Sequence, residues 1–97
     1  MSYRLTRRAA EDVRKIYRHG VETFGETQAE AYHTHLEHVF ALIAENPRMA
    51  RERMQITPPV RVHPTGPHLV IYSIKPSGDV LIIAVPNARE DWQDTLG

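Results

Sequence analysis

The sequence predicts an α+β domain in which an antiparallel helical hairpin packs on one face of a small, mostly antiparallel sheet of three to four strands. Three observations lead to this fold class. Two stretches in the first half carry apolar residues at helical spacing. The second half contains short β-rich runs separated by turns with proline or glycine. The length of 97 residues fits a single domain, 1–97.

The first predicted elements are a brief strand at Tyr3–Leu5 and a helix over residues 7–24. Thr6 is a suitable N-cap, because its hydroxyl can accept a backbone N–H that the first turn leaves unpaired. Gly20 lies on the apolar side of this helix, where it predicts close packing. Gly25 is a favourable C-cap, so the helix is expected to end there.

A second helix is predicted from Thr27 to about Glu45. Thr27 and Glu30 have the spacing of a capping box, in which each side chain pairs with the other residue's backbone N–H. Pro47 ends the helix, because proline cannot continue its hydrogen-bond ladder. The two helices, joined by a very short turn, form an antiparallel hairpin.

The second half predicts a connector over residues 48–59 and then three strands. The strands are expected at 60–63, 68–75 and 80–85. The last strand is apolar at every position, so both of its faces should be covered. It is therefore expected to be central, with the N-terminal strand beside it.

Composition excludes several kinds of function. The formal net charge is +0, from 12 basic and 12 acidic residues, which argues against non-specific coating of nucleic acid. The absence of cysteine excludes disulfides and thiolate catalysis. There is no apolar stretch typical of a signal peptide or a membrane span, so a cytoplasmic location is expected.

The histidines suggest two kinds of chemistry. His33, His35 and His38 lie near Glu30 and Glu37, but only His33 and Glu37 have a spacing that brings ligands together on a helix, so no metal site is predicted.

His63 and His68 flank a Pro-Thr-Gly-Pro turn, and with Arg61 and Tyr72 they could form an acid–base and phosphate-binding cluster. The alternative is a pair of half-exposed histidines at the edge of a turn. Because no carboxylate is placed nearby, the residues favour a small interaction domain over an enzyme.

Two further features suggest binding surfaces. One is a group of arginines that contains a single acidic residue, Glu52, and could contact a carboxylate or phosphate. Its members are Arg48, Arg51, Arg53 and Arg61. The polar C-terminal segment carries Trp92, a residue type common at protein interfaces. Either Arg89 and Trp92 form part of a target surface, or Trp92 folds back to cover an open edge of the core.

Four segments, in this order, resemble the ParE/RelE toxin superfamily, and its ParE branch most closely. They are YRLTRRAAEDVRKIY, FGETQAEAYHTHLEHVFALIAENP, GPHLVIYSIKPSGDVLIIAV and REDWQDTL. The resemblance covers nearly the whole chain and implies two helices on a small antiparallel sheet, which agrees with the elements predicted above.

The resemblance implies a growth-arresting toxin of a type II toxin–antitoxin system, with DNA gyrase as its target and no catalysis or cofactor. It also implies a ParD-like, DNA-binding antitoxin that folds onto a small apolar groove rimmed by arginines. The expected antitoxin contacts are Arg48, Arg51, Arg53, Arg61 and Tyr72, and the expected target contacts are Arg89 and Trp92. DNA is reached only through the antitoxin or gyrase.

Two alternatives remain within the superfamily: a RelE-type, ribosome-dependent mRNA endoribonuclease using Arg61, His63 and His68, and an inactive toxin retained as an antitoxin partner. Many relatives end the last strand with R-V-L-H, where this chain has Ala84, Val85, Pro86 and Asn87. Neither Asn87 nor Trp92 can act as a general base, which disfavours the nuclease alternative.

Overall fold

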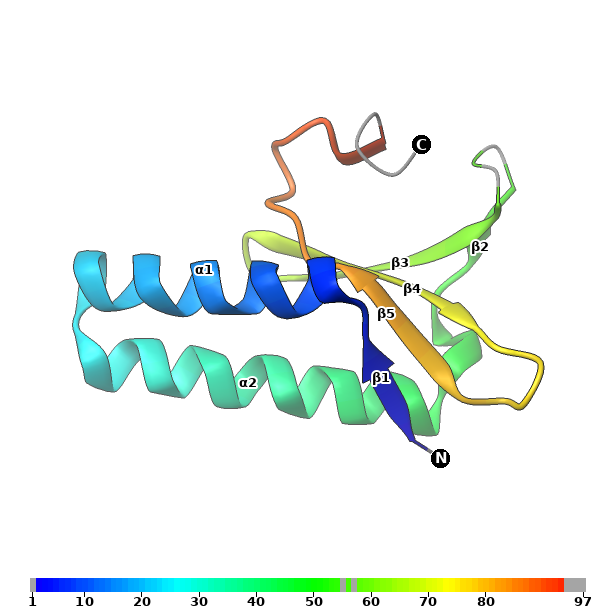
Figure 1. Cartoon of the computed structure of the whole chain (residues 1–97), viewed down its shortest axis with the longest axis horizontal. Coiled ribbons are helices and arrows are strands. Elements are labelled where there is room, and N and C mark those ends of the chain that lie inside the picture. The colour runs from blue at the N-terminus through cyan, green and yellow to red at the C-terminus, as the bar shows by residue number, and fades with distance from the viewer. Residues whose placement is uncertain (1, 55, 57, 94–97) are drawn as a thin grey trace.

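The computed structural model describes residues 2–54, 56 and 58–93 and shows the predicted α+β architecture (Figure 1). The elements, in chain order, are β1 (Tyr3–Leu5), α1 (Arg7–Phe24), α2 (Glu26–Glu45), the 3-10 turn η1 (Pro47–Met49), β2 (Glu52–Arg53), β3 (Val60–Thr65), β4 (His68–Ile74) and β5 (Val80–Ala84). The two helices form an antiparallel hairpin that covers one face of the sheet.

The five strands have the order β1-β5-β4-β3-β2. β5 pairs in parallel with β1 and antiparallel with β4, so the prediction that it lies beside the N-terminal strand is confirmed. It is an inner strand as expected, but the central strand of the five is β4. β2 is the strand that the sequence did not predict. It consists of two residues and pairs with β3 through Glu52–Arg61 and Arg53–Val60. A strand this short has no periodicity that a sequence pattern could show.

The helix ends follow the predicted chemistry at α1 but not at α2. The Thr6 hydroxyl accepts the N–H of Ala9 at 3.0 Å and donates to the carbonyl of Ile83 at 2.6 Å, which ties α1 to the end of β5. Gly25, with φ of 94°, is both the C-cap of α1 and the N-cap of α2. The predicted capping box at Thr27 is wrong, because α2 already begins at Glu26 and has no side-chain cap.

The hairpin is held together by close contact between its helices. A Cβ atom added to Gly20 would lie 3.2 Å from the Cβ of Ala29, a distance tighter than most side-chain contacts. Gly20 therefore permits the close approach that its place on the apolar side of α1 predicted.

The face of the sheet beneath the helices carries the larger core. Its buried residues are Ala9, Val13, Leu36, Val39, Phe40, Ile43, Ala50, Val70, Tyr72, Val80, Ile82 and Val85. The other face carries a smaller cluster of buried residues, comprising Val60, Val62, Ile71, Ala84 and Trp92. Ile82 and Ala84 belong to different faces although they are two residues apart. The irregular register between β4 and β5, where Ile71 pairs with Ala84 and Tyr72 with Ile82, accounts for this switch.

The segment after β5 crosses from one side of the sheet to the other. Leu69 N–H donates to the carbonyl of Pro86 at 2.9 Å, and Ala88 N–H donates to that of Pro67 at 2.8 Å. These bonds bring Trp92 to the second face, where its side chain is 6% exposed. Of the two predicted roles of Trp92, covering the core describes its place in the structure.

The helices are amphipathic rather than uniformly apolar. Within the described residues, neither combines the length and the apolar character needed to cross a membrane.

Candidate functional site

The helical hairpin is longer than the sheet that it covers, and this mismatch creates a groove. α1 and α2 have 18 and 20 residues, so they extend for about 27–30 Å at 1.5 Å per residue. Their connecting end projects past the sheet (Figure 1). Beneath this overhang lies a groove of about 840 Å³, bounded by the two helices, the β3–β4 turn and the segment after β5.

The inner surface of the overhang is apolar because it continues the stripe that forms the core further along the helices. Ile16 and Leu36 line the groove on the side of the core, and Phe24 lines it at the open end. Phe24 is 62% exposed, although it is a large aromatic residue. The groove thus leaves apolar surface in contact with solvent, which is typical of a binding site.

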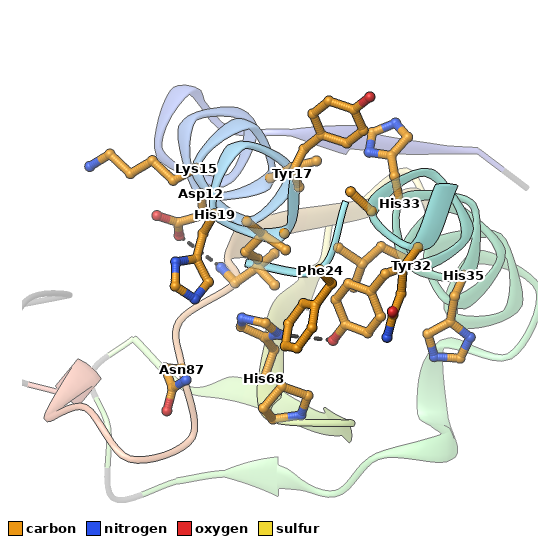
Figure 2. A pocket seen from close by; sticks show the side chains of 18 of the residues that line it. Asp12, Lys15, Tyr17, His19, Phe24, Tyr32, His33, His35, His68 and Asn87 are labelled. Atoms are coloured by element: carbon orange, nitrogen blue, oxygen red, sulfur yellow. Dashed lines mark hydrogen bonds between the residues drawn. The ribbon is translucent and has the colours of Figure 1, made fainter. Parts of the chain in front are cut away.

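Polar side chains gather where the groove meets the sheet (Figure 2). Nδ1 of His68 lies 2.8 Å from the hydroxyl of Tyr32, and Nε2 of His35 lies 2.8 Å from the hydroxyl of Thr65. Gly66 permits this arrangement: its φ is +55°, and an added Cβ would lie 3.2 Å from the Tyr32 hydroxyl oxygen. These contacts attach α2 to the β3–β4 turn.

Two carboxylates of the groove are engaged by backbone N–H groups. Oδ2 of Asp12 accepts the N–H of Val85 at 2.9 Å, and Oε1 of Glu90 accepts the N–H of Asn87 at 2.9 Å. Asp12 is also 3.6 Å from Nε of Arg8. The acidic side chains therefore hold the segment after β5 in place.

The groups around His68 shift the pKa of its imidazole in opposite directions. Burial lowers the pKa of the imidazole, the carboxylates of Asp12 and Glu90 act to raise it, and His19 acts to lower it. Burial also raises the pKa of the Tyr32 hydroxyl, so this group stays protonated and able to donate near neutral pH.

Two of the predicted nuclease residues, Arg61 and His68, lie well apart on the paired strands. The register places Arg61 opposite Tyr72 and His68 opposite Thr65, which separates Arg61 from His68 by roughly 13 Å along the strands at about 3.3 Å per residue. A guanidinium nitrogen of Arg61 donates to the carbonyl of Ala50 at 2.6 Å. Arg61 is thus bonded within the domain and lies away from His68, while His63 is placed between them in the register.

Two of the predicted antitoxin contacts make hydrogen bonds within the domain. Tyr72 is 0% exposed and donates to the carbonyl of Pro47 at 2.7 Å. Together with the Arg61–Ala50 bond, it attaches the connector after α2 to the sheet. Arg48, Arg51 and Arg53 are exposed, on or beside η1 and β2.

The rim of this groove differs from the arginine rim that the resemblance implied for an antitoxin groove. The exposed arginines lie near β2, away from the connecting end of the hairpin (Figure 1), and the groove lining contains none of the predicted arginines. Four histidines line it instead: His19, His33, His35 and His68. The sequence indicated histidines at this surface, because His33 and His35 flank the apolar stripe of the second helix. It did not show that the helices extend beyond the sheet.

The helix flank does not hold a metal-binding group in the described part of the chain. Nε2 of His33 is 3.9 Å from the carboxylate of Glu37, and within that part no three potential ligands converge on one point.

Comparison with known proteins agrees with the fold. The profile of the family described as "ParE toxin of type II toxin-antitoxin system, parDE" matches residues 3–92. The chain belongs to the ParE toxin family. It is 29% identical to Toxin ParE1 of Mycobacterium tuberculosis over 94 residues, which cover 97% of this chain and 96% of that protein.

A second ParE relative and a solved structure extend the comparison. Toxin ParE3 of Caulobacter vibrioides is 28% identical over 92 residues, or 95% of this chain and 91% of that protein. A structure described as the chromosomal ParDE TA system from P. aeruginosa matches with a TM-score of 0.75 and 22% identity, covering 90% of this chain and 95% of that one. At this identity, the structural match shows a shared fold.

Proposed function

We propose that this ParE family member is a toxin that arrests growth by inhibiting DNA gyrase, without catalysis, and that a ParD-like antitoxin neutralises it. The observation that carries the proposal is the family match over residues 3–92. The separation of Arg61 from His68 supports a binding protein over a nuclease. Action on gyrase would take place in the cytoplasm.

The target surface is proposed to lie on the segment after β5. Asn87, Ala88, Arg89 and Glu90 are exposed there, whereas Trp92 is buried against the sheet. Arg89 is the cationic group of this stretch and keeps its proposed role as a target contact. Trp92 then acts by holding the segment on the sheet.

The antitoxin is proposed to contact the exposed arginines Arg48, Arg51 and Arg53, which carry positive charge on or beside η1 and β2. Arginine pairs with carboxylates through two parallel hydrogen bonds, so an acidic stretch of the antitoxin is the expected counterpart. The described ParDE structure from P. aeruginosa supports an antitoxin partner through the shared fold.

The test is expression of the chain with and without the product of the neighbouring antitoxin reading frame. Growth arrest that the neighbour relieves, together with inhibition of gyrase supercoiling and intact mRNA, is the expected result. Codon-phased mRNA cleavage in a translation reaction would instead identify the ribonuclease alternative. Normal growth with the toxin alone would identify an inactive toxin that is retained as an antitoxin partner.

A further inference from the structure

The segment after β5 contains a compact turn that is built around Asn87. The N–H of Asn87 donates to Oε1 of Glu90 at 2.9 Å, and the carbonyl of Asn87 accepts the N–H of Glu90 at 3.1 Å. The side-chain oxygen of Asn87 accepts the N–H of Arg89 at 2.9 Å. The direction in which Arg89 leaves this turn therefore depends on where Asn87 is held.

His68 is the residue that meets Asn87 on the sheet. The two face each other in an isolated antiparallel bridge beyond the end of β5. Backbone hydrogen bonds of 2.9 and 2.8 Å flank this bridge; they join Leu69 to Pro86 and Ala88 to Pro67. Residues directly opposite each other in an antiparallel pair have neighbouring side chains on one face. Both His68 and Asn87 accordingly line the groove.

The imidazole of His68 is attached to α2 through Tyr32. Nδ1 of His68 lies 2.8 Å from the Tyr32 hydroxyl, and the centroids of the two rings are 5.6 Å apart. The hydroxyl also lies 3.3 Å from the carbonyl of Thr65, to which it can donate. Figure 2 shows the contact between Tyr32 and His68 as a dashed line, with Asn87 on the other side of His68. His68 therefore links a helix of the hairpin to the proposed target segment.

The Tyr32 hydroxyl fits closely against the β3–β4 turn, because a Cβ added at Gly66 would lie only 3.2 Å from it. Burial lowers the pKa of His68 and raises the pKa of Tyr32, so the neutral forms of both groups are favoured near pH 7. A neutral imidazole and a hydroxyl share one hydrogen bond, and the tautomer of the ring decides which of them donates. The contact thus fixes the orientation of the His68 ring without a charge.

Other contacts hold the segment at its two ends. Asp12 accepts the N–H of Val85 at 2.9 Å at the start of the segment, and Trp92 is buried at its end. The exposed turn between them meets the sheet at the bridge to His68. A change at His68 is therefore expected to move this turn while both ends of the segment stay in place.

We propose that Tyr32 and His68 are positioning residues for gyrase inhibition, which hold the turn around Asn87 so that Arg89 faces the target. The inference rests on the proposed function, because this segment is the proposed target surface. It assigns a role in inhibition to two side chains of the groove that do not belong to that surface. Without their contact, a smaller fraction of the molecules has the turn in place, and the apparent affinity for the target falls with that fraction.

The experiment measures inhibition of gyrase supercoiling and amide hydrogen exchange on the same variants of the full chain. Tyr32→Phe removes one oxygen and keeps the ring. The concentration for half-maximal inhibition is expected to rise by up to about tenfold, which corresponds to the loss of one hydrogen bond between neutral groups. The Ala88 N–H should exchange faster, whereas the Thr6 N–H, which donates to the carbonyl of Ile82 at 3.0 Å, should exchange as in the native chain.

Two variants of His68 test the same contact from its other side. His68→Leu removes the ring nitrogen and should weaken inhibition as Tyr32→Phe does. His68→Asn places an amide, which can donate or accept, near the position of Nδ1 and should restore part of the inhibition. Tyr3→Phe is the matched control, because Tyr3 lies on β1, packs against the ring of Phe40 and is not part of the groove lining.

Native inhibition by both Tyr32→Phe and His68→Leu would overturn the inference and leave the proposed function standing. Weaker inhibition with unchanged exchange of the Ala88 N–H would also overturn it, because the two side chains would then act other than by positioning the turn. Faster exchange at both Ala88 and Thr6 would show a general loss of stability and would overturn it as well. Absence of inhibition by the native chain would overturn the proposed function and the inference together.

Discussion

Two long helices cover one face of the sheet, whereas a single tryptophan-bearing segment covers the buried cluster on the other. Phe40, which is 1% exposed, lies in the core of the first face, and its ring packs against that of Tyr3 at 5.6 Å. Trp92, which is 6% exposed, closes the second. The comparison shows that the first face carries the larger core, whose edge also lines the groove. The second face links stability to the position of the proposed target segment.

The largest effect is expected where the helices meet the sheet. Phe40→Ala should lower the free energy of unfolding by about 3–5 kcal/mol, because it opens a cavity in the larger core. Urea unfolding followed by circular dichroism measures this loss. Phe24→Ala is the matched control: Phe24 is 62% exposed, so its change should stay within about 0.5 kcal/mol. Equal losses in the two variants would contradict the assignment of the core.

Trp92→Ala should cost less than Phe40→Ala, about 2–3 kcal/mol, because the exposed segment that carries Trp92 can collapse around the missing ring. Gyrase inhibition should weaken at the same time, since the segment loses its hold on the sheet. Trp92→Phe should retain part of both properties. Full inhibition by a well-folded Trp92→Ala protein would show that the second face and the target segment are independent.

The third expected effect concerns the start of that segment. Asp12→Ala leaves the N–H of Val85 without its acceptor, and Val85 is 2% exposed, so a loss of about 1–3 kcal/mol is expected. Because Trp92 is the only tryptophan, its fluorescence reports on the segment directly. The emission should shift to the red and become more accessible to acrylamide.

Asp12→Asn keeps an oxygen that can accept the Val85 N–H, so it should preserve most of the native emission. An Asp12→Ala protein with native emission and quenching would show that the segment is positioned without this carboxylate.

The smallest effect on stability is expected at Arg89, which is exposed on the segment. Arg89→Ala should change the free energy of unfolding by less than about 0.5 kcal/mol, while weakening inhibition in a gyrase supercoiling assay. Arg53→Ala, an exposed arginine on β2, is the control and should leave supercoiling inhibition unchanged. Equal inhibition by the Arg89→Ala and native proteins would remove Arg89 from the target surface.

Local sequence patterns were sufficient for most of the fold. The apolar spacing, the Thr6 cap and Pro47 predicted both helices, and short β-rich runs predicted the four longer strands, because each of these signals acts within a few neighbouring residues. The two-residue β2 and the start of α2 at Glu26 were missed. β2 exists only through its pairing with β3, and the start of α2 depends on the positive φ of Gly25.

The candidate site depended far more on tertiary structure. The arginine group was visible in the sequence, but the bonds from Arg61 to Ala50 and from Tyr72 to Pro47 are long-range, and they make these two side chains part of the scaffold. The histidine groove joins residues from α1, α2 and β4. The spacing of these residues along the chain does not predict that they line the same groove.

The sequence by itself determined the elements and the place of β5 beside the N-terminal strand, because periodicity, capping and turn chemistry are local properties of the chain. Four segments carried the resemblance to the ParE branch, and the family match over residues 3–92 confirmed it. Only the tertiary structure decided that Trp92 is buried, that Tyr72 is out of reach of a partner and that histidines line the groove. The physical reason is that burial and charge environment depend on which distant residues pack together. The groove in particular follows from two helices that are longer than the sheet beneath them.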